Sequence, residues 1–488
     1  MDFSIKKINL VLAASFLVAS AYAQNSTQNE YEEWRPSQNE YTDFDIGKLF
    51  SPDIVRNQLD VNFDFRSDHS RQNFSYPDRD GKLESSNFAG NISSYFSHYE
   101  NTRKRISILT GSVTISGDYS SLKDELTYSN DNLTNVDNLS NSFQRNYLYL
   151  NWSNQWYFSN LFFMHYGINN GISYNFKQNE IKNQSEDSNE KQKEFRTSIS
   201  TRLGVGYGRI ENVRDARQAV YIANALSKKK VLNRKLSDDE LFELSQIIST
   251  VKNKRFLDSR LRLIEEIKTV DSFLEDNDLL VDNGATYFTT LYDMWQYGDL
   301  FSRRSGYELS FIVSHGHSYQ NTKYTPVMRD VIYNYTNWPH VSLDFRYDKP
   351  FKLNWQHSLD ATVFGSHASS YLQNRETGND YKKNSAKHTR YSAYVNYSLG
   401  YYPNTRTNIQ VTASQSITKD KYDDGIDSMW YSTMIGPNLY YYFSPNLRLT
   451  GECRFIYEPR RKKWNEGFYH NSNSISSLFN IQLTYSIF

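Results

Sequence analysis

Apolar and polar residues alternate along much of this chain, which is the pattern of β-strands that have one apolar and one polar face. In the last such segment, 474–488, Phe479 and Ile481 alternate with Asn480 and Gln482. Many segments reach about 10 residues, the length that a tilted strand needs to cross a membrane, whereas strands of soluble sheets average about 5 or 6. We count about fourteen such segments, which begin near Asn57, Phe88, Arg105, Ser142, Leu161, Glu194, Gly306, Pro339, Lys352, His388, Thr405, Ser428, Asn446 and Ser474.

One long interval has a different period. Between Gly208 and Ser305 the apolar residues recur about every 3.6 positions, which predicts amphipathic helices. Asn212 is predicted to cap the first helix, and Ser237 with Glu240 has the spacing of a capping box before the second. The third helix is predicted to have an apolar side formed by Leu257, Leu261, Ile264 and Leu274.

The composition limits the class of protein. A mean hydropathy of −0.72 excludes a bundle of membrane helices, which would need several long apolar runs. Aromatic residues make up 16% of the chain, with 39 tyrosines, an excess typical of side chains that lie at water–lipid boundaries. A net charge of zero gives no support for binding to nucleic acid. The single cysteine, Cys453, excludes a disulfide within the chain.

The beginning of the chain has the features of a signal peptide. Lys6 and Lys7 precede an apolar stretch, 10–20, and the small residues Ala21 and Ala23 mark a cleavage site. The mature chain is therefore expected to begin at Gln24. The polar segment that follows is predicted to be a periplasmic tail, with a plug folded into the lumen of a barrel as the alternative.

The closing segment, together with a leader and many similar strands, resembles the last strand of an outer-membrane β-barrel. Phe488 lies one residue out of step with the apolar face, whereas the final Phe of that family usually lies in register with it. Two stretches, GYGRIENV at 206–213 and NKRFLDSR at 253–260, are similar to envelope barrels of the Bacteroidota type. This second resemblance covers the middle third of the chain and implies no known activity.

These observations predict an all-β transmembrane antiparallel β-barrel of about 14 strands with an inserted α-helical periplasmic domain. An even number of strands puts both chain ends in the periplasm, and counting strands puts the insert there as well. Outer connectors, such as 68–87 and 118–141, are predicted to be long and inner ones short. The predicted parts are a signal peptide at 1–23, a tail or plug at 24–56, a first barrel half at 57–209, the helical insert at 210–305 and a second barrel half at 306–488.

Charged residues of both signs alternate with the apolar positions of the strands. On a closed wall they would line the lumen, where they could pair with one another or border a path for water. The lumen-lining candidates are Asp60, Asp64, Arg66, Arg202, Glu308, Asp344, Arg346, Asp360, Arg448, Glu452 and Arg454.

The leading functional hypothesis is an outer-membrane channel or transport barrel for small solutes, with the helical insert as a lid or adaptor. Its expected partners are outer-membrane lipid and the barrel-assembly machinery. The alternative is an envelope assembly or interaction protein, in which the barrel is an anchor and the helices dock a periplasmic protein. The aromatic candidates for such docking are Tyr287, Phe288, Tyr292 and Trp295.

No enzymatic activity is expected. His315 and His317 would share one face of a strand, but no third metal ligand accompanies them. His357 points to the opposite face from Ser358 and Asp360, so these three cannot converge as a hydrolytic set. We therefore assign no catalytic residue, no metal site and no cofactor from the sequence.

Overall fold

The protein is described by a computed structural model, and the structural statements below concern a defined part of the chain. The described residues are 40–41, 43–76, 79–128, 134–182, 187–253, 259–281, 284–297, 303–325, 331–375, 382–404, 406–444, 447–463 and 469–485. The predicted signal peptide, the first part of the predicted tail, and Phe488 lie outside these residues.

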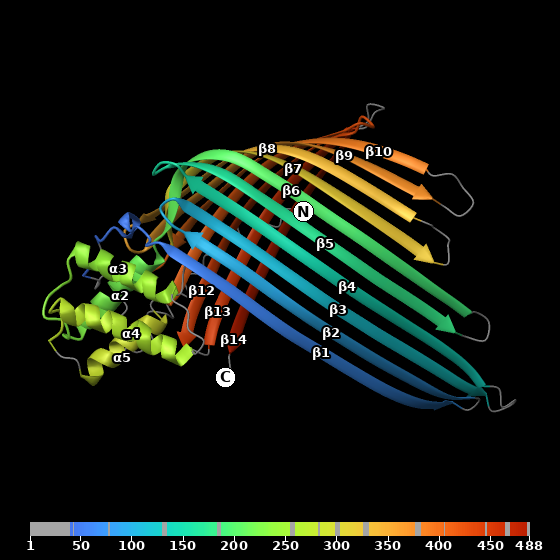
Figure 1. Ribbon diagram of the computed structural model, residues 1–488, viewed down its shortest axis with the longest axis horizontal. Coiled ribbons are helices and arrows are strands. Elements are labelled where there is room, and N and C mark those ends of the chain that lie inside the picture. Colours follow the sequence, from blue (N-terminus) through green and yellow to red (C-terminus); the bar gives the residue numbers. More distant parts are fainter. Residues whose placement is uncertain are drawn as a thin grey trace, which may run out of the picture.

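One antiparallel sheet of 14 strands dominates the structure, and its spatial order is the order of the sequence, β1 to β14. Figure 1 shows that the sheet curls strongly and that the helices gather at one end of its strands. The strands are β1 (Ile54–Tyr76), β2 (Arg79–Asn101), β3 (Arg105–Tyr128), β4 (Thr134–Tyr157), β5 (Phe162–Lys182), β6 (Asp187–Asn212), β7 (Arg304–Thr325), β8 (Val331–Phe351), β9 (Trp355–Arg375), β10 (Lys382–Tyr401), β11 (Thr407–Tyr422), β12 (Asp427–Ser444), β13 (Leu447–Lys463) and β14 (Tyr469–Tyr485).

The strands are longer than the sequence predicts, so the prediction that the outer connectors are long is wrong. β11 has 16 residues and β6 has 26. The predicted connector 68–87 is occupied instead by the continuing ladder of β1 and β2, in which Asp68 pairs with Asn87. This distal part is rich in polar and charged side chains, with ion pairs such as Lys82–Glu84 at 2.7 Å, and its apolar residues are scattered, such as Leu122, which pairs with Leu139. Apolar alternation cannot reveal a strand whose two faces both meet water.

The hydrogen-bonded order begins at β1 and ends at β14, and no pairing joins these two strands among the described residues. β14 is exposed along almost its whole length, with Ile475 at 83% and Phe479 at 66%. The described residues therefore form a curled 14-stranded sheet, and closure of the predicted wall by pairing of β1 with β14 is not detected among them.

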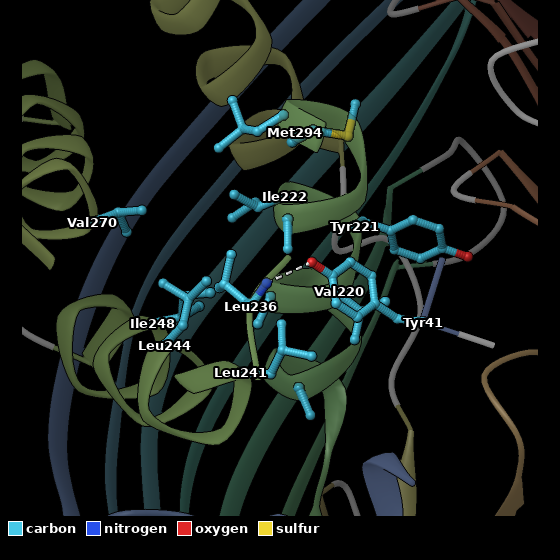
Figure 2. Packing of buried hydrophobic residues seen from close by; sticks show 14 of the residues in the cluster. Tyr41, Val220, Tyr221, Ile222, Leu236, Leu241, Leu244, Ile248, Val270 and Met294 are labelled. Atoms are coloured by element: carbon cyan, nitrogen blue, oxygen red, sulfur yellow. Dashed lines mark hydrogen bonds between the residues drawn. The ribbon is translucent and has the colours of Figure 1, made fainter. Parts of the chain in front are cut away.

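Four of the described helices lie between β6 and β7 and form the hydrophobic core of the described residues. They are α2 (Arg214–Lys228), α3 (Asp238–Asn253), α4 (Ser259–Asp276) and α5 (Ala285–Tyr297). Figure 2 shows the apolar side chains that meet there, including Val220, Leu244, Ile248 and Met294. The predicted stripe of the third helix is wrong at Ile264, which is 49% exposed. Leu274 of the predicted stripe is buried, as expected, and Leu257 lies outside the described residues. Ile267, Val270 and Phe273 complete the buried face of α4.

The segment that precedes β1 belongs to this helical core. Tyr41, Phe44 and Ile46 are buried against the helices, and the Tyr41 hydroxyl accepts a hydrogen bond from the backbone N–H of Leu236, at 3.1 Å. Figure 2 shows this bond as a dashed line. Phe44 packs on Phe242 with ring centroids 4.8 Å apart. Tyr41 and Phe44 of the predicted tail or plug therefore pack on the helices. Further along, Gly47 and Ser51 are hydrogen-bonded to Ser305 and Asn212 at the ends of β7 and β6, and residues 54–56 belong to β1.

The capping box of α3 is confirmed. The Glu240 carboxylate accepts from the Ser237 backbone N–H at 2.8 Å, and the Ser237 hydroxyl accepts from the Glu240 N–H at 3.3 Å. Arg234 adds two hydrogen bonds to Glu240, of 2.6 and 2.9 Å. These bonds, above all that from Arg234, lower the pKa of Glu240 from 4.5 to about 2.

We expect Glu240→Gln to remove a pH-dependent part of the stability of the helical domain. Because the pKa of Glu240 is lower in the folded state, the charged form stabilises folding above pH 4.5, and that stabilisation is lost as the pH falls toward 2. Glutamine keeps the capping geometry but cannot titrate. Unfolding followed by circular dichroism should show a shallower decline between pH 5 and 2 in Glu240→Gln than in the unchanged protein. If the stability of the two proteins falls equally between pH 5 and 2, the Glu240 carboxylate does not contribute the pH-dependent stability.

Candidate functional site

The register of the sheet places all eleven charged candidates on one face. Residues that pair directly across antiparallel strands point to the same side. Glu308 pairs with Arg346, and Arg346 pairs with Asp360, which connects β7, β8 and β9 through three of the candidates. Following the pairs from β1 to β14 puts the others on the same side. We call this side the charged face.

The opposite face carries exposed large apolar side chains on every strand. We call it the apolar belt, and one member from each strand, β1 to β14, is Phe63, Ile92, Val113, Leu148, Ile168, Leu203, Phe311, Leu343, Val363, Val395, Val411, Ile435, Phe455 and Ile481. A soluble protein rarely leaves so large a continuous apolar surface in water.

Two rows of aromatic rings border the belt. The row near the helices contains Phe162, Tyr207 and Tyr307, with neighbouring ring centroids 4.7 and 5.9 Å apart. The distal row contains Phe195, Tyr319, Tyr335 and Tyr371, with neighbouring centroids 6.3, 4.9 and 6.3 Å apart.

The spacing of the two rows agrees with the thickness of a membrane. Tyr207 and Phe195 lie 12 positions apart on β6, and Tyr307 and Tyr319 lie 12 positions apart on β7. At about 3.3 Å per residue and a tilt of about 40°, 12 residues span roughly 30 Å along the axis of a barrel. The hydrocarbon core of a bilayer is about 30 Å thick.

Several members of the charged face interact with one another or with amides. Arg346 and Asp360 lie 3.9 Å apart, and Arg454 pairs with Glu452 on the same strand. Glu308 accepts a hydrogen bond of 3.0 Å from Gln155 on β4, across the two intervening strands.

Gly206 of β6 lies on the same face, between β5 and β7, and a Cβ there would meet the ring of Phe163 at 2.1 Å. The small residues of β6 therefore allow side chains from β4, β5 and β7 to meet.

Two glycines lie within β6 and β7, close to the points where the chain leaves and re-enters the sheet. Gly208 and Gly306 have φ angles of 109° and 126°, a region that favours glycine. A Cβ at Gly208 would lie 2.1 Å from the carbonyl oxygen of Tyr307, and one at Gly306 would lie 2.1 Å from that of Arg209. This close approach of β6 and β7 holds the base of the helical domain against the end of the sheet.

A buried joint then fixes the helical domain to connectors of the sheet. Arg303 donates to the carbonyl oxygens of Leu353 and Trp355, at 2.9 and 2.6 Å, and to Gln356 Oε1 at 3.0 Å. Its guanidinium lies 4.7 Å from the centre of the Tyr402 ring. Burial, and then the charge of Arg217, lower the pKa of Arg303 to about 9.

Arg217 of α2 approaches the same tyrosine from the helical side. Its guanidinium lies 5.4 Å from the Tyr402 ring and donates to the carbonyl oxygen of Asn404 at 2.9 Å. Arg217 and Arg303 are 2% and 1% exposed. The helices are thus tied to the β8–β9 and β10–β11 connectors, which places them over one end of the sheet (Figure 1). We call Arg217, Arg303 and Tyr402 the joint.

The aromatic docking candidates divide into two pairs. Tyr287 and Trp295 are 3% and 6% exposed, so their assignment to a docking surface is wrong. Tyr287 donates to Asp271 at 2.5 Å, and the Trp295 indole donates to Glu266 at 2.9 Å, which makes both part of the helical core. Phe288 and Tyr292 are 53% and 43% exposed and remain available to a partner.

His315 and His317 lie on the side of the apolar belt. His315 pairs with Thr201, and His317 pairs with Ile199, in the ladder between β6 and β7. The Nδ1 atom of His317 lies 2.8 Å from the side-chain oxygen of Asn337 on β8. This contact, next to the distal aromatic row, gives the imidazole a polar partner within the sheet.

Comparisons with known proteins give little further information. No protein-family model and no curated protein sequence matches this chain. Among solved structures, the β-domain of the Bordetella autotransporter BrkA is 10% identical, with 72% of this chain and 92% of that chain covered and a TM-score of 0.22. The transport unit of the Escherichia coli autotransporter AIDA-I is 9% identical, with 92% and 95% covered and a TM-score of 0.15. TM-scores this low carry no argument about the chain. None of the described helices is long and apolar enough to cross a membrane.

Proposed function

We propose that this chain is an outer-membrane β-barrel that forms a channel for small hydrophilic solutes, with the helical domain as a lid over one mouth. The observation that carries the proposal is the apolar belt between two aromatic rows, opposite a face that bears charges of both signs. Lipid would cover the belt, and water would fill the space along the charged face. The proposal includes no enzymatic activity and no cofactor.

The proposal requires β1 and β14 to pair with each other in the membrane. An unpaired strand edge in lipid leaves backbone N–H and C=O groups without partners, at several kcal/mol each. β1 and β14 are antiparallel by strand count and both contribute residues to the belt, such as Phe63 and Ile481. Their pairing would make the belt continuous around the wall.

The proposed orientation follows from the two ends of the sheet. The distal strand ends are rich in polar and charged residues and would project outside the cell, beyond the membrane. The helical domain would then lie in the periplasm, where the buried joint holds it over the inner mouth.

Planar-bilayer recording of the purified full chain tests the channel. We expect discrete conductance steps in the unchanged protein and more frequent opening in Arg217→Met, because that change removes the contact of α2 with the Asn404 carbonyl. The matched control is Arg71→Met. Arg71 lies at the distal end, is 55% exposed, and its ion pair with Glu84 is long, at 3.6 Å. Silence of all three proteins would contradict the channel.

The second candidate function, a membrane anchor that docks a periplasmic protein, rests on Phe288 and Tyr292. Exposed aromatic side chains are enriched at protein interfaces, and these two lie on α5 away from the core. Co-purification of a partner that is lost in the double variant Phe288→Ala, Tyr292→Ala would favour this function. A silent bilayer would favour it further.

A further inference from the structure

The charged face contains a pocket of about 440 Å³ at the end of the sheet nearest the helices. It spans β7 to β11, and its wall includes Asn396, Asn408 and Gln410. A second pocket, of about 350 Å³, continues across β11 to β14 and shares Asn408 with the first. Asn438, Asn480 and Gln482 line this second pocket. Together they form an amide-rich track along the charged face.

The charges around the first pocket are already neutralised. Asp348 lies 3.2 Å from Arg304 and accepts a hydrogen bond of 2.5 Å from Ser358. Asp360 lies 3.9 Å from Arg346. Each carboxylate in the wall thus has a cationic neighbour, so an ion entering the pocket meets no uncompensated charge of opposite sign.

The amides, in contrast, have hydrogen-bonding capacity left. The Gln410 side-chain N–H donates to Ser398 at 3.0 Å, which directs the amide while its carbonyl oxygen can still accept. The side-chain oxygen of Asn408 is buried and has no hydrogen-bond partner among the described residues. That oxygen is enclosed by neighbouring atoms, so the free amide capacity open to a ligand in the pocket is that of Gln410.

The joint keeps this wall in place. Gln356, another member of the wall, accepts from Arg303 at 3.0 Å and donates to the carbonyl oxygen of Arg304 at 3.0 Å. Tyr402 separates the pocket from the two buried arginines and is 6% exposed. The polar wall is therefore built on the rigid base of the helical domain.

We infer that this track binds an uncharged, polyhydroxylated ligand, an oligosaccharide of several rings. Hydroxyl groups both donate and accept, which matches amides that can do the same. An apolar ligand would leave the amides unpaired, and the paired charges give an ion no advantage. Two pockets that share Asn408 offer room beyond a single sugar ring. The inference rests on the proposed function, because the charged face must border the solute path.

Titration calorimetry of the full chain in detergent, with maltohexaose as the probe, tests the inference. We expect measurable binding by the unchanged protein and about tenfold weaker binding by Gln410→Ala, since one amide pair is lost. Asn396→Leu, which has nearly the same shape, should weaken binding similarly. The matched control is Asn62→Leu on β1, on the charged face but outside both pockets, which should bind as the unchanged protein does. Hexagalacturonate, a charged oligosaccharide of equal length, should bind more weakly than maltohexaose.

The outcomes separate the two proposals. Failure of maltohexaose to bind, with conductance intact, overturns the inference and leaves the channel standing. Equal binding by Gln410→Ala and Asn62→Leu, or tighter binding of hexagalacturonate, also overturns it. If Asn396→Leu fails to fold, Gln410→Ala still decides, because shortening a side chain at a pocket wall inserts no apolar group. Maltohexaose binding by a protein that is silent in bilayers would contradict the channel alone.

Discussion

Replacing Val313 by arginine is expected to destabilise the folded protein in lipid by about 2 to 4 kcal/mol, the cost of a cation at the midplane of a bilayer. Val313 is 47% exposed on the apolar belt and lies midway between Tyr307 and Tyr319 of the two aromatic rows. If lipid covers this position, the guanidinium must leave water without a counter-charge. Denaturant titration of the protein folded into lipid vesicles measures the loss.

Two controls separate the lipid from the substitution itself. Ser112→Arg places the same side chain on the charged face of β3, where Ser112 pairs with Tyr149, and should cost less than 1 kcal/mol. Val313→Leu keeps the position apolar and should be close to neutral. Equal losses at Val313 and Ser112 would show that the two faces meet the same medium, against the proposal.

Loss of the Arg303 side chain is expected to have the next largest effect, about 1 to 3 kcal/mol, because three buried acceptors lose the donor that satisfies them. Arg303→Met would leave the carbonyl oxygens of Leu353 and Trp355 without this donor. Lysine keeps the charge but lacks the planar guanidinium that reaches three acceptors. Arg303→Lys should therefore retain only a part of the stability that Arg303→Met loses. Equilibrium unfolding measures the loss of stability.

The same variant should also loosen the helical domain. Limited proteolysis is expected to cut within 214–297 faster in Arg303→Met than in the control Arg71→Met, whose arginine is mostly exposed and should contribute less than 1 kcal/mol. Unchanged cleavage and unchanged stability in Arg303→Met would mean that the joint does not hold the helices to the sheet.

The sequence predicts the parts of this fold whose two faces differ in polarity. Fourteen strands are confirmed because each has a stretch, such as 199–205 of β6, in which apolar and polar side chains alternate. The capping box at Ser237 and Glu240 is confirmed for a related reason, since local hydrogen bonds fix it whatever surrounds it. The shared face of the eleven charged candidates follows from the same alternation.

Other features depend on contacts between distant parts of the chain. The distal strand extensions carry only scattered apolar residues, such as Leu122 and Leu139, so they lack the regular alternation that marks the rest of each strand. The packing of Phe44 on Phe242 joins segments almost two hundred positions apart, and no local pattern indicates it. The burial of Tyr287 and Trp295 is set by Asp271 and Glu266, which satisfy their polar atoms within the core. The amide-rich track likewise arises only when β7 to β14 lie side by side.

Spin labels placed singly along β7, from 309 to 314, test the central claim most directly, with Cys453 replaced by serine to leave one thiol in each protein. In lipid vesicles, labels at 309, 311 and 313 should collide with dissolved oxygen, which concentrates in the bilayer. Labels at 310, 312 and 314 should collide with a water-soluble nickel complex. A period of two in opposite phase for the two reagents is the predicted result. Equal access of the nickel complex to all six positions would contradict a lipid-facing belt.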